Sequence, residues 1–190
     1  CAGCAETSYA RLITQLFGDR MYISNATGCS SIWGGPAATS PYTTNAEGHG
    51  PAWANSLFED NAEHGYGMYL GQTAIRERLI DDAKAIASSE KATEAVKAAA
   101  VAYLDTLNDA KANADASKAL VEAIKASGAE CDKCKDIVDN SEYLSKKSVW
   151  IFGGDGWAYD IGFGGVDHVL ASGRNVNIMV FDTEVYSNTG

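Results

Sequence analysis

The stretch that decides the fold reads Ser148-Val-Trp-Ile-Phe-Gly-Gly-Asp-Gly156, and it is followed by Asn175-Val-Asn-Ile-Met-Val-Phe181. Each contains a short apolar run with β-branched or aromatic residues, which predicts two strands. Between them, Asp160 to Ala171 can form a helix that stops at Gly173. Strand, helix and strand in this order make a βαβ unit, so we expect parallel strands joined by a right-handed crossover.

The ends of these two strands carry the residues of a candidate binding site. Asp155 follows the first strand, and Thr183 and Val185 follow the second. Ligands of open α/β sheets collect at the carboxyl ends of strands, where backbone amides favour an anion. Mg²⁺ takes a few oxygen ligands from protein and the rest from phosphate and water. The Asp155 carboxylate, the Thr183 hydroxyl and a carbonyl near Val185 therefore predict a diphosphate and Mg²⁺ site.

Composition favours one α/β domain. The chain has 190 residues, of which 46% are hydrophobic and 19 are glycine, which is enough for one sizeable core and many tight loops. Residues 1–71 are expected to be mostly loop, with one strand at Met21–Ser24. Residues 72–128 are alanine-rich and predict three amphipathic helices, with caps at Ser89 and Asp115 and breaks at Asn108–Asp109 and Gly128.

The charge pattern excludes several function classes. A net charge of −10 without a basic stripe argues against a nucleic-acid partner. The sequence has neither an apolar run long enough for a membrane span nor a secretory leader, so we expect no membrane association and a cytoplasmic location, with a hydrogenosome or similar organelle as the alternative. The chain begins inside a cysteine motif, which leads us to expect a fragment of a larger protein.

The cysteines fall into two groups. Cys1, Cys4 and Cys29 form a Cys-x-x-Cys pair with a distant third thiol, a spacing that suits zinc or an iron–sulfur centre and does not choose between them. Cys131 and Cys134 form a second pair in a charged, polar stretch. There we expect a solvated loop rather than a redox pair or a metal site, although exposure would permit a disulfide.

Four ordered blocks of sequence carry a family resemblance. They are Cys-Ala-Gly-Cys-Ala-Glu-Thr at 1–7, Asn-Ala-Thr-Gly-Cys-Ser-Ser at 25–31, Gly-Gly-Asp-Gly-Trp-Ala-Tyr-Asp-Ile-Gly at 153–162 and Asp-Thr-Glu-Val-Tyr-Ser-Asn-Thr-Gly at 182–190. With these blocks the chain resembles the C-terminal thiamine diphosphate-binding domain of pyruvate:ferredoxin (flavodoxin) oxidoreductase. It differs from the wider group of thiamine enzymes at Thr183, where a metal-binding asparagine is usual.

The resemblance implies a thiamine diphosphate-binding fold, with a mostly parallel sheet flanked by helices. It also implies thiamine diphosphate, Mg²⁺ and [4Fe-4S] cofactors, and the oxidative decarboxylation of pyruvate to acetyl-CoA and carbon dioxide. Coenzyme A would accept the acyl group, and ferredoxin or flavodoxin would take the electrons. The remaining domains of the same enzyme, arranged as a homodimer, would supply the fourth cluster ligand and the acid that activates the aminopyrimidine. This chain alone would therefore be inactive.

Residue roles also follow from the resemblance. Cys1, Cys4 and Cys29 would ligate the iron–sulfur cluster, and Asp155, Thr183 and Val185 would hold Mg²⁺. Asn188 would point toward the reacting end of the cofactor and is the candidate catalytic residue. The full set of implied cofactor contacts is Glu6, Cys29, Gly154, Asp155, Gly156, Trp157, Thr183, Glu184, Val185, Tyr186, Ser187 and Asn188.

Two alternatives keep the same diphosphate site. One is a non-oxidative thiamine diphosphate-dependent lyase, and the other is an oxidoreductase of a different 2-oxo acid. In either case, the N-terminal cysteines would bind a structural metal such as zinc.

Overall fold

The structure is a computed structural model that describes residues 1–36, 38–129 and 131–189. It divides into two compact units, one formed by Cys1–Leu70 with Ser148–Gly190 and the other by Gly71–Lys147. This division does not test the prediction that the chain is a single domain, which stays a prediction. In the described part of the chain, no helix combines the length and apolar character needed to cross a membrane.

A four-stranded parallel sheet organises the first unit. Its order is β2-β1-β3-β4, with bounds Ala52–Ser56, Met21–Ala26, Ser148–Gly154 and Val176–Phe181. The predicted parallel pairing of β3 with β4 is confirmed, with Val149 opposite Val176 and Gly154 opposite Phe181. The prediction of an α/β fold with a mostly parallel sheet is also confirmed.

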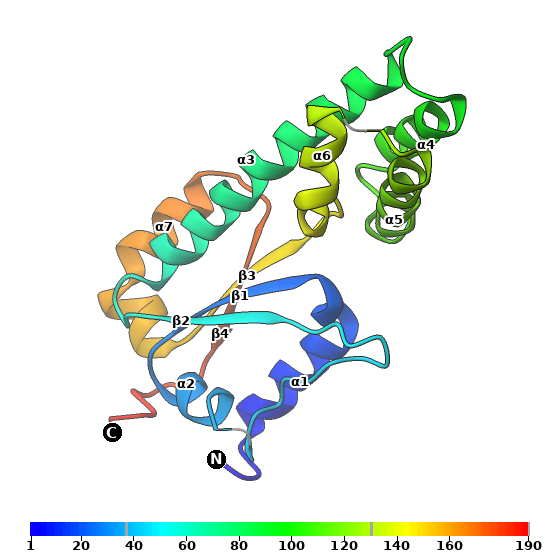
Figure 1. The fold of residues 1–190 in the computed structure, drawn as a ribbon. Coiled ribbons are helices and arrows are strands. Elements are labelled where there is room, and N and C mark those ends of the chain that lie inside the picture. The colour runs from blue at the N-terminus through cyan, green and yellow to red at the C-terminus, as the bar shows by residue number, and fades with distance from the viewer. Residues whose placement is uncertain (37, 130, 190) are drawn as a thin grey trace. The chain divides into compact units, whose positions relative to one another are not determined.

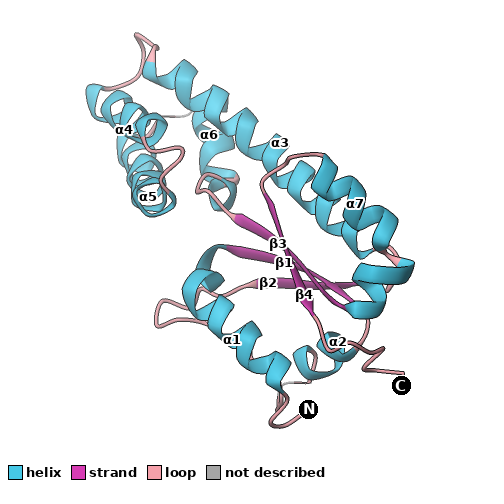
Figure 2. Ribbon diagram, turned by 180° about the vertical axis from the view of Figure 1, so that it is seen from behind, coloured by secondary structure: helices cyan, strands magenta, loops and turns pink. Residues whose placement is uncertain are grey.

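Helices cover both faces of this sheet (Figure 2). On one face, α1 (Ala5–Phe17) and α2 (Cys29–Gly34) bury Ala10 and Trp33 against Ile23, Phe152 and Phe181. On the other, α7 (Phe163–Ala171) and the start of α3 (Asn61–Ala87) pack against Ala26 and Ile151. Because neighbouring strand residues point to opposite faces, Ile151 and Phe152 enter different cores.

Several elements of the first unit depart from the sequence-based expectations. Helices α1 and α2 and strand β2 lie in the stretch that was expected to be mostly loop. The helix expected over 160–171 instead starts as a π-helical turn at Trp157–Ile161 and becomes α-helical only at Phe163. The inserted turn brings the Trp157 carbonyl within 2.8 Å of the Gly162 amide, which donates to it.

The second unit is helical (Figure 1). It contains the rest of α3 (Asn61–Ala87), then α4 (Glu94–Asp105), α5 (Ala110–Ser127) and α6 (Asp132–Asp139). The three predicted helices correspond to α3, α4 and α5, although α3 begins eleven residues before the predicted start. The core of this unit includes Leu79, Tyr103 and Leu120.

The caps of these helices are partly different from the predicted ones. Thr93, not Ser89, caps α4, with its side chain accepting from the Val96 amide. Asp109, not Asp115, caps α5, because its carboxylate accepts from two first-turn amides at 3.0 and 2.9 Å. Gly128 ends α5 in the left-handed conformation with φ 63°, as a glycine stop requires. The predicted breaks were therefore correct and the caps were wrong.

A partly buried polar network connects residues near the end of the second unit to its helices. The Asn113 side-chain oxygen accepts from the Arg76 guanidinium at 3.1 Å and from the Lys146 amide at 2.9 Å. Arg76 also donates to the Leu144 and Leu107 carbonyls, each at 3.1 Å. These bonds satisfy polar groups that the helical core would otherwise leave without partners.

Candidate functional site

A cavity of about 350 Å³ lies at the carboxyl ends of β1, β3 and β4. This is the edge at which parallel α/β sheets bind ligands. Its walls come from four segments that are far apart in the sequence, together with α1 through Glu6. The lining residues are Glu6, Thr27, Gly28, Cys29, Ser30, Phe58, Gly154, Asp155, Gly156, Phe181, Val185, Tyr186, Ser187, Asn188 and Thr189.

Asp155 and Thr183 meet beside this cavity, as the βαβ geometry predicted. Both Asp155 carboxylate oxygens lie 3.0 Å from the Thr183 amide, which donates to them. The Thr183 hydroxyl lies 3.3 Å from Asp155 Oδ1 and 3.2 Å from the Val185 carbonyl oxygen. Three oxygens of different chemical type, namely carboxylate, hydroxyl and carbonyl, are therefore gathered at one point.

The surroundings of Asp155 stabilise the negative charge of its carboxylate. Its side chain is buried, with 8% exposure, and burial by itself favours the neutral acid. Hydrogen bonds from the Thr183 amide and from its own amide outweigh that effect and hold the pKa of Asp155 below its ordinary value. The carboxylate is therefore a permanent anion at neutral pH, as a hard-cation ligand must be.

The loop after β4 is fixed by the residues of the β3–α7 connection. The Tyr159 hydroxyl donates to Asp182 at 2.9 Å, and the Tyr186 hydroxyl donates to Asp160. Both hydrogen bonds favour the protonated phenol, which raises the pKa of each tyrosine. Glu184 bends the loop with a positive φ of 64°. The loop is thereby held over the carboxyl end of β3.

Gly156 is the residue that allows this closure. A Cβ at this position would lie 2.4 Å from the Tyr186 ring, inside the distance that real contacts allow. The same ring also packs near Phe58, with ring centroids 6.2 Å apart. Gly156, the second glycine of the Gly-Asp-Gly motif, therefore makes room for the Tyr186 ring, which lines the cavity.

Asn188 and Cys29 lie next to each other in the cavity lining. The Cys29 sulfur lies 3.9 Å from the Asn188 side-chain oxygen, although 159 residues separate them. Cys29 is the first residue of α2 and follows directly on the loop after β1. The structure thus brings the predicted catalytic residue beside a predicted cofactor contact.

Glu6 reaches the cavity from α1 and is held by Trp33. The Trp33 indole N–H donates to Glu6 Oε2 at 2.8 Å, and both side chains are buried. The sequence reasoning singled out Glu6 but missed this partner, since nothing local in the sequence links a tryptophan to an acid 27 residues away. Phe58 and Phe181, which also line the cavity, were missed for the same reason.

Trp157 and Glu184 stand apart from the cavity lining. Trp157 is fully buried and packs against Gly153 and Gly162, where a Cβ would meet its ring at 2.4 Å. Glu184 belongs to the exposed surface of the loop after β4. The cofactor contacts predicted for these two residues stay predictions.

The three N-terminal cysteines are free thiols. Cys1 is exposed, and Cys4 and Cys29 are partly exposed. Within residues 1–36, 38–129 and 131–189, no group of three or more His, Cys, Asp or Glu side chains gathers as a metal site. These thiols as placed do not form a cluster cage, so cluster ligation by them stays a prediction. The oxygen set at Asp155 is of another kind, with one carboxylate and two neutral oxygens, and it fits Mg²⁺.

Comparison with known proteins adds a second line of evidence. No protein-family model matches the chain. The chain is 56% identical to the pyruvate-flavodoxin oxidoreductase of Klebsiella pneumoniae and 59% identical to the pyruvate:ferredoxin oxidoreductase of Moorella thermoacetica. It is 47% identical to the mitochondrial pyruvate dehydrogenase [NADP(+)] of Euglena gracilis.

Each of these alignments covers the whole of this chain but only 16%, 17% and 10% of the respective relative. The chain therefore spans about a sixth of the length of the first two. At this level of identity over every residue, the chain matches a segment of the pyruvate-flavodoxin/ferredoxin oxidoreductase family.

Proposed function

We propose that the cavity binds the diphosphate of thiamine diphosphate together with Mg²⁺. The observation that carries this proposal is the convergence of the Asp155 carboxylate, the Thr183 hydroxyl and the Val185 carbonyl at the end of two adjacent parallel strands. One buried carboxylate with neutral oxygens suits a cation that keeps its remaining positions for phosphate and water. The adjoining cavity offers room for the phosphates.

The residues around the cavity have distinct roles in this proposal. Asp155, Thr183 and Val185 hold the metal, and Gly154 and Gly156 bring the backbone close to the diphosphate. Ser187 and Asn188 line the cavity beyond Tyr186, and Asn188 is directed toward the reacting end of the ligand. Trp33 fixes the carboxylate of Glu6, so that a buried acid is held in one orientation at the cavity wall.

We further propose that the protein containing this chain oxidatively decarboxylates pyruvate to acetyl-CoA and carbon dioxide. When bound, thiamine diphosphate supplies the carbanion chemistry that a protein side chain lacks. The relatives named for pyruvate and for flavodoxin or ferredoxin support this substrate and these electron acceptors. Coenzyme A, [4Fe-4S] clusters, the other domains of a homodimer and a cytoplasmic location belong to the same proposal.

Binding is tested with Asp155→Asn in the full-length protein. The substitution keeps the shape and removes the charge, so we expect the affinity for thiamine diphosphate at fixed Mg²⁺ to fall at least tenfold, which is about 1.4 kcal/mol. Thr183→Val should be milder, because it deletes one neutral oxygen. Asp105→Ala, an exposed acid at the end of α4, is the control for charge loss. Calorimetric affinity that is equal in Asp155→Asn and the control refutes the site.

Activity is tested by following pyruvate consumption, acetyl-CoA formation and the visible absorbance of ferredoxin or flavodoxin under anaerobic conditions. Asn188→Ala should slow turnover and affect diphosphate affinity less than Asp155→Asn does, because Asn188 is not one of the three proposed metal ligands. Decarboxylation of pyruvate without reduction of any acceptor would favour the non-oxidative lyase. The NADP(+) in the name of the Euglena relative makes that nucleotide a further acceptor to include.

A further inference from the structure

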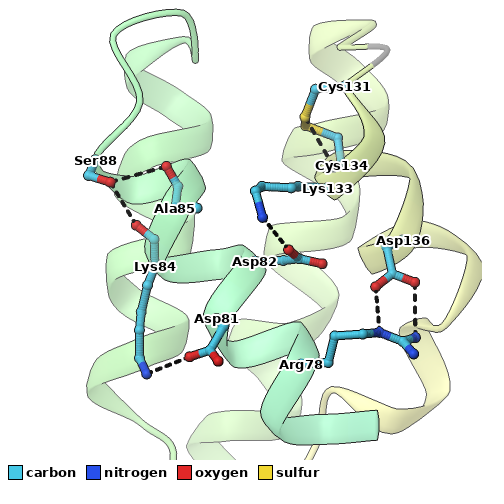
Figure 3. A network of polar contacts seen from close by, with 10 residues as sticks. All are labelled: Arg78, Asp81, Asp82, Lys84, Ala85, Ser88, Cys131, Lys133, Cys134 and Asp136. Carbon is cyan, nitrogen blue, oxygen red and sulfur yellow. Dashed lines mark hydrogen bonds and ion pairs between the residues drawn. A yellow bond between two sulfur atoms is a disulfide. The ribbon is translucent and has the colours of Figure 1, made fainter.

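Cys131 and Cys134 lie at the start of α6 and are joined by a disulfide (Figure 3). Their Cα atoms are 5.1 Å apart, and the Cys134 amide lies 3.1 Å from the Cys131 sulfur. Cys131 caps the helix and Cys134 sits in its first turn. The solvated loop that the sequence favoured here was wrong, because Ile137 gives this charged segment an apolar residue to bury in the helical core.

The two sulfur-bearing residues have unequal access to solvent. Cys131 is exposed, whereas Cys134 is only 3% exposed and belongs to the core with Ile137 and Leu144. An external thiol can therefore reach only one of the two. An accessible cysteine with a buried partner three residues on directs the attack of an external thiol to one sulfur.

The start of α6 also favours the anionic form of the accessible sulfur. Unpaired backbone N–H groups of a first helical turn stabilise a thiolate at the cap. Two of the charged residues nearby are paired with α3. Lys133 binds the Asp82 carboxylate at 2.8 Å, and Asp136 receives two bonds from the Arg78 guanidinium at 2.8 and 3.0 Å (Figure 3).

The same ion pairs connect α6 to α3, a role that the disulfide, which lies within the start of α6, does not have. Lys133 and Asp136 anchor the helix to α3, and Ile137 is fully buried. In the chain-entropy view a disulfide stabilises a protein more as the loop that it closes grows longer, and this one closes a loop within a single helical turn. Its structural contribution is therefore at the low end of what disulfides give.

We propose that Cys131 and Cys134 form a thiol–disulfide exchange site whose substrate is a dithiol. A thiolate of the dithiol attacks the Cys131 sulfur, the Cys131–Cys134 bond breaks, and Cys134 leaves and takes a proton from solvent. The second thiolate of the dithiol then attacks the dithiol's first sulfur, the bond from that sulfur to Cys131 breaks, and Cys131 leaves as a thiolate that can take a proton from solvent. Two electrons and two protons pass to the cysteine pair, and the dithiol becomes a disulfide. The reverse sequence oxidises the pair.

The test uses the full-length protein equilibrated anaerobically with mixtures of dithiothreitol and its cyclic disulfide. Acid quenching is followed by alkylation with N-ethylmaleimide and mass spectrometry of a peptide with both cysteines. The protease must not cleave after lysine, because Lys133 separates the two. We expect a reversible change between no label and two labels at a single midpoint, with one label at every mixture in Cys131→Ser and in Cys134→Ala.

A second measurement tests the asymmetry. In the reduced protein, a brief alkylation should label Cys131 at least about tenfold faster than Cys134, because reactivity follows access and thiolate character. The wild-type titration decides the proposal even if a variant folds poorly. A disulfide that persists in excess dithiothreitol, thiols that never oxidise, equal labelling of the two cysteines, or tight binding of added Zn²⁺ by the reduced pair would each overturn it.

Discussion

Adding one methyl group to Gly153 or to its neighbour Gly154 should have opposite effects. A Cβ at Gly153 would lie 2.4 and 2.8 Å from two carbons of the Trp157 ring and 3.0 Å from the Ala26 Cβ. Trp157 is fully buried and pressed against Gly162 on its other side, so it cannot move away. A Cβ at Gly154 meets only the Phe181 carbonyl oxygen, at 3.9 Å, which is ordinary contact.

The size of the difference follows from these distances. Both Gly→Ala changes reduce the freedom of the unfolded chain, worth about 0.4–1 kcal/mol in favour of folding, and this gain is common to the two variants. Gly153→Ala alone adds overpacking, which costs about 1–3 kcal/mol. The opening free energy of β3 should therefore differ between the variants by about 1–3 kcal/mol, a factor of roughly 5 to 150 in the opening equilibrium.

Hydrogen exchange measured by mass spectrometry on peptides from β3 in the full-length protein gives this ratio directly. Gly154→Ala should protect these amides as well as wild type or slightly better, and Gly153→Ala should protect them less. Equal protection in the two variants, or weaker protection in Gly154→Ala, would mean that Trp157 is not packed against the strand as described.

Three further outcomes are expected. The pKa of Asp155 is lowered in the folded protein, so the stability that this carboxylate contributes is complete above the ordinary aspartate value of 3.8 and is lost as the pH falls through the lower folded value. Asp155→Asn should therefore reduce the drop in melting temperature that calorimetry records as the pH is lowered. Trp33→Phe should lower the free energy of unfolding by about 1–3 kcal/mol, because a buried carboxylate oxygen of Glu6 loses its donor. In a double-mutant cycle with Glu6→Gln, the two changes in unfolding free energy should be coupled rather than additive. Tyr103→Phe should lower the opening free energy of α4, measured by hydrogen exchange, by only about 0.5–1.5 kcal/mol. The Leu144 carbonyl loses the phenol donor at 3.0 Å but keeps its hydrogen bond from the Arg76 guanidinium.

The parts of the fold that were predictable are those whose signals are local. Strands β3 and β4 each contain a short run of apolar, mostly β-branched or aromatic residues, and the βαβ topology then places Asp155 beside Thr183. Strand β2 gives no such signal, because its residues Ala-Trp-Ala-Asn-Ser have low strand propensity apart from the tryptophan. It becomes a strand through pairing with β1, a tertiary effect that no local pattern contains.

Helices α1 and α2 were missed for a related reason. Both lie in a stretch rich in Gly, Ser, Thr and Asn, a composition that predicts loops, and neither is capped by a side-chain hydrogen bond from its N-cap residue. Their apolar residues find their partners only in the folded sheet, where Trp33 meets Phe181 edge to face at 5.5 Å. The pairing of Trp33 with Glu6 depends on that packing and could not be predicted before it.

The position of the helical unit between β2 and β3 has a consequence for the order of folding. Met21 of β1 pairs with Ser148 of β3, so 127 residues must be synthesised before this edge of β1 finds its partner. At about 5–20 residues per second, that interval lasts roughly 6 to 25 seconds. Meanwhile residues 71–147 form a compact unit of their own. We therefore expect the helices of residues 71–147 to fold first during synthesis. Until β3 has been made, the edge of β1 that pairs with β3 stays unpaired. The nascent sheet, rather than the helical unit, is therefore the part that a chaperone would bind.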